Sequence, residues 1–293
     1  MRMLVTGGTG FLGGALVKAA VAGGHEVAVL TRAAGARLGP RVHRIVGELA
    51  LPPWAEIRTF GPEVVVHAAW ITTPGAYLES VENDEWLRWS LAFAAGLAGA
   101  GLRRWVALGT CIEYAVTGAP AMEDATPLVP TSRYARTKVA LHEGLRAILG
   151  GTGVGLAWAR IFYPYGPGEH PARLASWLAG RIRAGEPFGL RTPASTKDYI
   201  HKDDVGSALL TLACAGEEGA FNVGTGMGVT VEELARTLAG LAGRPELVVV
   251  EPGVVVDPLD HVVADVGRLR GLGWRPQVSL VDGLRGLLES RRE

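Results

Sequence analysis

Short runs of apolar residues, many of them β-branched, recur through the first half of the chain. Between most of them lie longer segments in which apolar positions fall every three or four residues, as on one face of a helix. The short runs lack an apolar–polar alternation, which is typical of strands covered on both faces. Six strands are predicted, at residues 2–6, 26–30, 42–46, 63–68, 104–109 and 154–159, with helices near 10–23, 79–100 and 132–149.

This alternation predicts right-handed crossovers between parallel strands, and therefore an α/β fold with a doubly wound parallel sheet. The texture changes after residue 162, where Gly, Pro and Arg gather in "YPYGPGEHPARL" and short helices and strands follow irregularly. We expect residues 1–162 to form the first domain and residues 163–293 a smaller C-terminal lobe. Residues 198–223 are expected to return to the first domain.

The amino-acid composition limits which binding partners and metal sites are expected. The 293 residues include 29 Lys plus Arg and 29 Asp plus Glu, which gives no electrostatic reason to expect nucleic acid or an anionic membrane. The two cysteines have no paired spacing and the seven histidines include no helix-spaced pair, so we expect neither a disulfide nor a metal site. Met1 leads almost directly into the first predicted strand, and no long apolar run is present. We therefore expect a cytoplasmic protein without a signal peptide or a membrane span.

A glycine-rich turn follows the first predicted strand, with Gly7, Gly10 and Gly13 in "TGGTGFLGG". Glycine is needed where the backbone turns tightly, where it approaches a pyrophosphate and where a helix packs on a strand. The N-terminus of the following helix offers free amides to phosphates. A glycine-rich turn can also exist without a ligand, but its place in the first strand–helix–strand unit favours dinucleotide binding. Residues 1–162 are thus predicted to be a Rossmann-type dinucleotide-binding domain, and residues 163–293 a substrate-binding lobe.

The end of the second predicted strand bears on the choice of cofactor. An acid at this position would bond the adenosine ribose hydroxyls of NAD. Here Thr31 and Arg32 occupy the tip, and a guanidinium can form a bidentate pair with a 2′-phosphate. NADP(H) is therefore expected, with NAD(H) as the alternative; a solvated surface arginine is the competing interpretation of Arg32. Glu48, after the third strand, is placed to meet the adenine amino group or is a plain loop acid.

Tyr134 and Lys138 in "RYARTK" are one helical turn apart and share a face of the predicted helix. A nearby ammonium lowers the pKa of a tyrosine from its ordinary value of about 10, which makes the phenol a usable acid or base near neutrality. An exposed pair of this kind is frequent by chance. This pair, however, follows a strand-end hydroxyl, Thr110, by 24 residues and a phosphate-binding turn far upstream. The combination predicts a catalytic group.

These motifs and their order resemble the extended short-chain dehydrogenase/reductases, in particular the nucleotide-sugar epimerases, dehydratases and ketoreductases. The resemblance covers essentially the whole chain and rests on "TGGTGFLG", "VVVHAA", "GTCIEY", "YARTK", "RIFYPYGPG", "KDYIHKDDV", "FNVGTG" and "LGWRPQVSLVDGL". It implies a catalytic triad of Thr110, Tyr134 and Lys138. Tyr134 would exchange a proton with a sugar carbonyl or hydroxyl, Lys138 would tune it and hold the nicotinamide ribose, and Thr110 would hydrogen-bond the reacting oxygen.

The resemblance also implies two sets of binding residues. Those expected to bind the cofactor are Gly7, Gly10, Phe11, Leu12, Gly13, Thr31, Arg32, Glu48, Leu49, Ala68, Ala69, Tyr134, Lys138 and Ile161. Those expected to bind a nucleotide-diphosphate sugar are Thr72, Thr110, Tyr134, Tyr163, Arg173 and Lys197.

The residues after Thr110 bear on the reaction. Sugar 4,6-dehydratases of the resembled family carry Asp and Glu there, whereas this chain has Cys111 and Ile112, so dehydration is not expected. Glu113 should point to the opposite face of the strand, as a supporting or loop contact. A reductase consumes NADPH at each turnover, so Arg32 favours reduction of a nucleotide-linked 4-keto-6-deoxyhexose. A nucleotide-sugar epimerase with tightly held NAD(P) is the alternative, and a non-catalytic dinucleotide sensor is a third interpretation.

The predicted helix near residues 79–100 carries two apolar stripes. One contains Trp86, Trp89, Phe93 and Leu97, and the other contains Leu87, Leu91, Ala94 and Ala98. A helix packed on a sheet needs only one stripe, so the other is expected to be an exposed patch rich in tryptophan. From this we predict a homodimer joined by a four-helix bundle.

Overall fold

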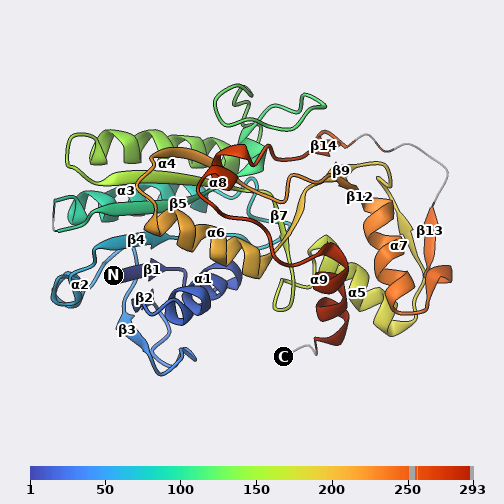
Figure 1. Ribbon diagram of the computed structural model, residues 1–293, viewed down its shortest axis with the longest axis horizontal. Coiled ribbons are helices and arrows are strands. Elements are labelled where there is room, and N and C mark those ends of the chain that lie inside the picture. The colour runs from blue at the N-terminus through green and yellow to red at the C-terminus, as the bar shows by residue number, and fades with distance from the viewer. Residues whose placement is uncertain (100, 251–254, 256, 291–293) are drawn as a thin grey trace.

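The computed structural model describes residues 1–99, 101–250, 255 and 257–290. Its centre is a sheet of seven parallel strands in the order β11–β6–β5–β4–β1–β2–β3 (Figure 1). The predicted strands are β1 (Arg2–Thr6), β2 (Glu26–Thr31), β3 (Val42–Val46), β4 (Val64–His67), β5 (Arg104–Thr110) and β6 (Gly155–Ile161), and β11 (Gly219–Val223) pairs with β6. The predicted parallel Rossmann-type sheet is confirmed.

Helices cover both faces of the sheet (Figure 1). On one face α1 (Phe11–Ala22) and α6 (Lys202–Cys214) pack against each other and against the strands, through residues such as Leu16, Leu209 and Leu212. On the other face lie α2 (Trp54–Phe60), α3 (Glu82–Leu97) and α4 (Arg133–Leu149), which bury a second apolar layer with Trp105 and Trp158. Apolar strands without alternation fit this arrangement because both of their faces are covered.

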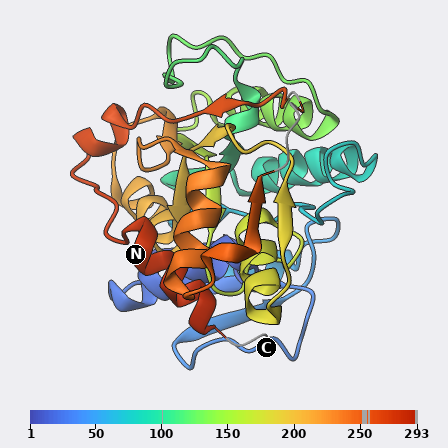
Figure 2. The same ribbon diagram turned by 90° about the vertical axis from the view of Figure 1, so that its right-hand side faces the viewer.

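The C-terminal lobe has a core of its own. Helices α5 (Leu174–Ala184), α7 (Val231–Leu241) and α9 (Leu280–Glu289) enclose it, and Figure 2 turns this lobe toward the viewer. Strand β8 (Phe188–Leu190) pairs with β13 (Val248–Val250) at its edge. The shorter elements are η1 (Cys111–Glu113), β7 (Tyr163–Tyr165), β9 (Thr196–Lys197), β10 (Tyr199–His201), β12 (Val229–Thr230), η2 (Pro245–Leu247), β14 (His261–Val262) and α8 (Gly267–Gly271).

The chain crosses between the sheet and the lobe more than once. After β6 it enters β7 and α5, and it comes back through β10 into α6, which packs on α1, and then into β11. The Asp204 carboxylate at the start of α6 accepts hydrogen bonds from the backbone amides of Gln277 and Val278, which lead into α9. Within the described residues, no helix is both long enough and apolar enough to cross a bilayer.

Helix α3 packs one of its apolar faces on the sheet and covers part of the other. Its buried side chains are Asn83, Ser90, Phe93, Ala94 and Leu97, so one face does pack on the sheet. The indoles of Trp86 and Trp89 are half-buried and line a cavity, and Leu91 packs on Gly144 of α4 in the same chain. These side chains are thus partly covered within one chain, and the homodimer through this helix stays a prediction.

Candidate active site

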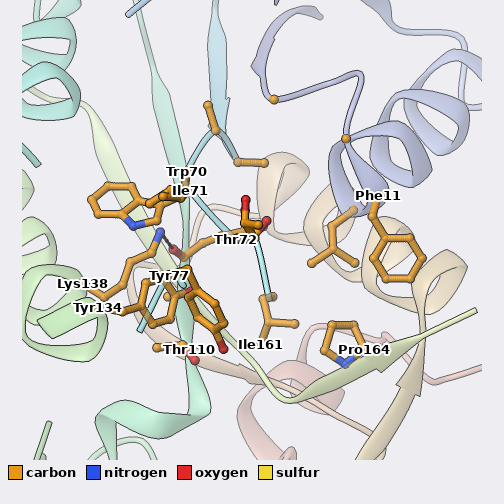
Figure 3. Close-up of a pocket in the computed structure, with 18 of the residues that line it drawn as sticks. Phe11, Trp70, Ile71, Thr72, Tyr77, Thr110, Tyr134, Lys138, Ile161 and Pro164 are labelled. Carbon is orange, nitrogen blue, oxygen red and sulfur yellow. Dashed lines mark hydrogen bonds between the residues drawn. The ribbon is translucent and has the colours of Figure 1, made fainter. Parts of the chain in front are cut away.

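A cavity of about 1810 Å³ opens where the parallel strands end at their carboxyl termini, and both the sheet domain and the lobe line it (Figure 3). Ligands of open α/β sheets bind at this edge. Every residue predicted to bind cofactor or substrate lines this cavity, with the exception of Lys197. Phe11 and Pro164 lie across the cavity from Trp70, Lys138 and Tyr134 in Figure 3.

The turn after β1 is compact in a way that only glycine permits. Gly7 has φ 71°, and a Cβ there would lie 2.7 Å from the backbone nitrogen of Ala69. A Cβ on Gly13 would lie 2.1 Å from the carbonyl oxygen of Gly7. Gly10 is the N-cap of α1 and supplies no side-chain acceptor to the first amides of the helix. Those amides face the cavity edge, so the turn fits a dinucleotide pyrophosphate.

The tip of β2 carries a cation and no acid. Thr31 is buried, and its Oγ1 accepts a hydrogen bond from the amide of Ala33. Arg32 is exposed and lines the cavity together with Glu48 and Leu49. A phosphate on the adenosine ribose would find a guanidinium here.

Three side chains of the predicted triad meet at the ends of β5 and α4 (Figure 3). Thr110 is the last residue of β5. The Ser132 hydroxyl caps α4 by accepting a hydrogen bond from the amide of Ala135, so Tyr134 and Lys138 stand in the first two turns. All three members of the triad are buried. The arrangement has the components of a proton-transfer site.

The protonation of this site is governed by burial. Burial raises the pKa of Tyr134 above its ordinary value, and the positive charge of Arg173 opposes that shift only in part. Burial lowers the pKa of Lys138 to about 7, with the charge of Glu113 acting in the other direction. The Lys138 Nζ is 5.7 Å from the centre of the Tyr134 ring. Burial therefore sets the direction of the Tyr134 pKa in this arrangement, and the tuning of Tyr134 by Lys138 stays a prediction.

Glu113 is a supporting contact, as predicted, but it reaches its position from a 3₁₀ turn and not from a strand. Cys111–Glu113 form a 3₁₀ turn instead of continuing β5, so the Glu113 carboxylate folds back and accepts a hydrogen bond of 2.8 Å from the amide of Thr110. Its other oxygen pairs with Nε of Arg160 at 2.7 Å, and both oxygens accept from the indole of Trp158. Glu113 is completely buried. The acid therefore holds the strand end that carries the catalytic hydroxyl.

The neighbours of Glu113 extend this support. An Nη of Arg160 donates to the Tyr114 phenol, which donates to the side-chain carbonyl of Asn222 in β11. Burial raises the pKa of the Cys111 thiol to about 12, so that thiol is not a nucleophile. The stretch from residue 108 to residue 115 thus ends the strand and also fixes the position of Thr110.

A sequence model described as "NAD dependent epimerase/dehydratase family" matches residues 3–224. The chain belongs to this family. UDP-glucose 4-epimerase of Mycolicibacterium smegmatis is 27% identical over 307 residues, covering 99% of this chain and 98% of that protein. The dTDP-4-dehydro-6-deoxyglucose reductase of Escherichia coli is 28% identical over 188 residues, covering 61% and 58%. The structure of the Thermus thermophilus UDP-glucose 4-epimerase in complex with NAD superposes with a TM-score of 0.84 at 28% identity, covering 99% and 98%.

Membership of the epimerase/dehydratase family confirms that the chain is an enzyme.

The C-terminal lobe also supplies side chains to the site. Arg173 reaches across to the sheet domain: its guanidinium is 5.0 Å from the centre of the Tyr77 ring, and one Nη donates to the carbonyl of Thr72 at 3.4 Å. The Tyr77 ring meets the Tyr134 ring edge-on at 4.9 Å. Tyr163 lines the same wall. Tyr77 was missed because a single tyrosine in a loop carries no periodic signal.

Lys197 was predicted to bind substrate, but unlike the other predicted substrate-binding residues it does not line the cavity. Its ammonium pairs with the Asp257 carboxylate at 3.0 Å and also donates to the carbonyl of Leu259. The side chain is buried and does not line the cavity. The structure does not bring Lys197 together with the other predicted substrate residues, because its ammonium is paired inside the lobe.

Sequence reasoning also missed an aromatic wall in this epimerase/dehydratase family member. Trp70, Trp86 and Trp89 all line the cavity. Trp70 and Trp86 have ring centres 6.3 Å apart, and Trp86 and Trp89 meet edge-on at 5.6 Å. The signal was the Trp that follows "VVVHAA" after β4. In the described part of the chain, no group of three or more His, Cys, Asp or Glu side chains is arranged to hold a metal ion.

Proposed function

We propose that the protein is an NADP-dependent reductase of a nucleotide-linked 4-keto-6-deoxyhexose. NADPH, when bound, supplies the hydride that reduces the carbonyl carbon. The proton that completes the alcohol comes from the Tyr134 phenol. The carbonyl double bond becomes a single bond, and the phenolate recovers a proton from solvent, so electrons and protons balance.

Arg32 at the tip of β2 is the observation that carries this proposal. It is exposed, it lines the cavity, and no acid stands beside it at the end of the strand. A carboxylate there would repel a 2′-phosphate, whereas a guanidinium forms charge-assisted hydrogen bonds with one. The glycine turn between β1 and α1 would hold the pyrophosphate, since Gly7 and Gly13 allow the tight backbone packing that brings the start of α1 to the cavity.

The protonated state of Tyr134 is compatible with the role of proton donor. A buried phenol whose pKa is raised is a proton donor at neutral pH, which is what an incoming carbonyl needs. Thr110 would hydrogen-bond the same carbonyl oxygen. Arg173, with Tyr77 and Tyr163, would face the nucleotide diphosphate from the lobe.

A nucleotide-sugar epimerase is the second candidate. The relatives from M. smegmatis and T. thermophilus that match over nearly the whole chain are UDP-glucose 4-epimerases, and the latter is bound to NAD. Such an enzyme oxidises and re-reduces one carbon, so its cofactor is not consumed.

Two measurements separate these functions. The enzyme is mixed with NADPH and a panel of nucleotide-linked 4-keto-6-deoxyhexoses, and absorbance of NADPH is followed; a reductase consumes one NADPH for each alcohol formed. Interconversion of UDP-glucose and UDP-galactose without net cofactor consumption would instead establish the epimerase. Cofactor binding without either reaction would favour the sensor.

The cofactor preference has its own test. Fluorescence titration should give tighter binding of NADPH than of NADH, and Arg32→Asp should reverse the order because it adds an acid and removes the cation. Arg37→Asp, an exposed change on the loop after β2, is the matched control. Equal affinities in the parent, or an unchanged order in Arg32→Asp, would refute the NADP assignment.

A further inference from the structure

The ammonium of Lys138 has an unusual set of neighbours. The side chain is 3% exposed, and among the described residues it forms no ion pair. Its Nζ donates to the carbonyl of Leu108 at 2.9 Å and lies 3.9 Å from the centre of the Trp70 ring system (Figure 3). Burying an ammonium without a carboxylate partner costs free energy. For Lys138 the carbonyl of Leu108 and the indole face of Trp70 offset that cost.

Trp70 is itself held in place. Its Nε1 donates to the side-chain carbonyl of Asn83 at 2.8 Å. Asn83 is completely buried in the first turn of α3, and its amide donates to the carbonyls of Tyr77 and Ser80. One asparagine thus fixes the indole under Lys138 and the backbone of Tyr77, whose ring packs on Tyr134. The position of Trp70 is tied to the geometry of the catalytic pair.

An ammonium has three protons to direct. The bond to Leu108 uses one and the contact with the indole face can use a second, which leaves one for a hydroxyl in the cavity that Lys138 lines. We propose that Trp70 is a positioning residue for Lys138: its indole face keeps the amine in the charged form and aims the free proton at a ribose hydroxyl. This inference rests on the proposed role of Lys138 in holding the nicotinamide ribose.

Other charged or titratable groups face the same ammonium from each packed element. Glu113 in η1 raises the pKa of Lys138, and Tyr134 lies on its own helix. His67 on β4 has its pKa lowered to about 3 by burial and by the charge of Lys138, so it is neutral at working pH. Leucine at position 70 still fills apolar space beside the amine and keeps it buried, so Trp70→Leu removes the cation–π contact while the burial that lowers the pKa remains. The pKa of Lys138 should therefore fall.

The test is a direct titration of Lys138 in the protein without substrate. Lysines are labelled with ¹³C at Cε, the Lys138 signal is assigned with Lys138→Met, and its chemical shift is followed against pH. A cation–π contact of ordinary strength corresponds to a shift of about 0.5–1 pH unit. Trp70→Leu should lower the pKa by that amount, and Trp70→Phe, which keeps an aromatic face, by less than half of it. An unchanged pKa in Trp70→Leu would overturn the proposal, and so would equal shifts in the two variants.

Circular dichroism checks that each variant folds. If Trp70→Leu does not, Trp70→Met takes its place in the comparison with Trp70→Phe. Cofactor affinity is then measured across the same pH range: in Trp70→Leu the loss of affinity at rising pH should begin about 0.5–1 unit earlier than in the parent. Neither the Lys138 titration nor the cofactor affinity involves a sugar. A negative keto-sugar assay therefore does not affect the conclusion about Trp70, and a negative titration does not affect the proposed reduction.

Discussion

The Glu113–Arg160 pair beneath Thr110 gives the sharpest prediction for stability. Glu113→Ala removes the acceptor of three buried donors: the Arg160 guanidinium, the indole of Trp158 and the amide of Thr110. Arg160 is 3% exposed and Glu113 is fully buried, so water does not replace the lost acceptor readily. The variant therefore leaves an uncompensated charge inside the protein.

Breaking a buried ion pair by removing one partner costs about 3–5 kcal/mol. We expect Glu113→Ala to lower the free energy of unfolding by that amount, since the orphaned amide and indole add to the loss while the Tyr114 phenol still accepts from Arg160. A loss of this size is a large part of the roughly 5–15 kcal/mol that stabilises a native protein. Glu113→Gln keeps an acceptor for Thr110 but removes the charge, so its loss should lie between those of the parent and the alanine variant.

Urea unfolding followed by circular dichroism measures these losses. Glu232→Ala is the matched control, because Glu232 pairs with Arg236 at the same 2.7 Å on the exposed surface of α7. Exposed pairs are worth at most about 1 kcal/mol. If Glu113→Ala loses no more stability than Glu232→Ala, burial does not give the Glu113 pair its importance and the argument fails. A lower kcat in Glu113→Gln, at nearly parental cofactor affinity, would further show that the pair positions Thr110.

Three further predictions concern the reaction and the assembly. Tyr134→Phe should lower kcat by about 10²–10⁴-fold while cofactor affinity stays near the parental value, measured by steady-state kinetics and fluorescence titration; retention of most of the turnover would exclude the phenol as the acid. No 4-keto-6-deoxy product should form from nucleotide-linked glucose, because Cys111 and Ile112 stand where an acid pair would act; its characteristic absorbance in base would contradict this. Light scattering should give twice the 30.8 kDa mass of one chain, and a mass near 30.8 kDa at micromolar concentration would defeat the homodimer.

The features that sequence predicted well are set by local backbone requirements. The strands follow from unbroken apolar runs, and the turn at Gly7 from a left-handed backbone that glycine adopts without strain. The spacing of Tyr134 and Lys138 follows from one turn of a helix. Each of these features depends on residues close together in the chain, so the local amino-acid sequence is enough to predict it.

The features that sequence missed depend on partners far along the chain. Glu113 folds back because Arg160, 47 positions later, neutralises it. Lys197 is withdrawn from the cavity by Asp257, 60 positions later. The indole of Trp70 is placed under Lys138 by Asn83, on a helix that sequence reasoning had assigned to a dimer contact. At Lys197, charge and residue type did not distinguish a substrate contact from an internal pair.

The way in which α6 and β11 come back to the sheet has a consequence for engineering. Helix α6 buries Leu209 and Leu212 against the sheet, and β11 covers the edge of β6, yet both are encoded after the first segment of the lobe. A fragment that stops at residue 162 would expose an apolar face and an open strand edge, and both favour aggregation. To transfer the substrate specificity of a relative, residues 163–198 and the chain after residue 223 must therefore be replaced together. The residues between them, which include α6 and β11, stay native.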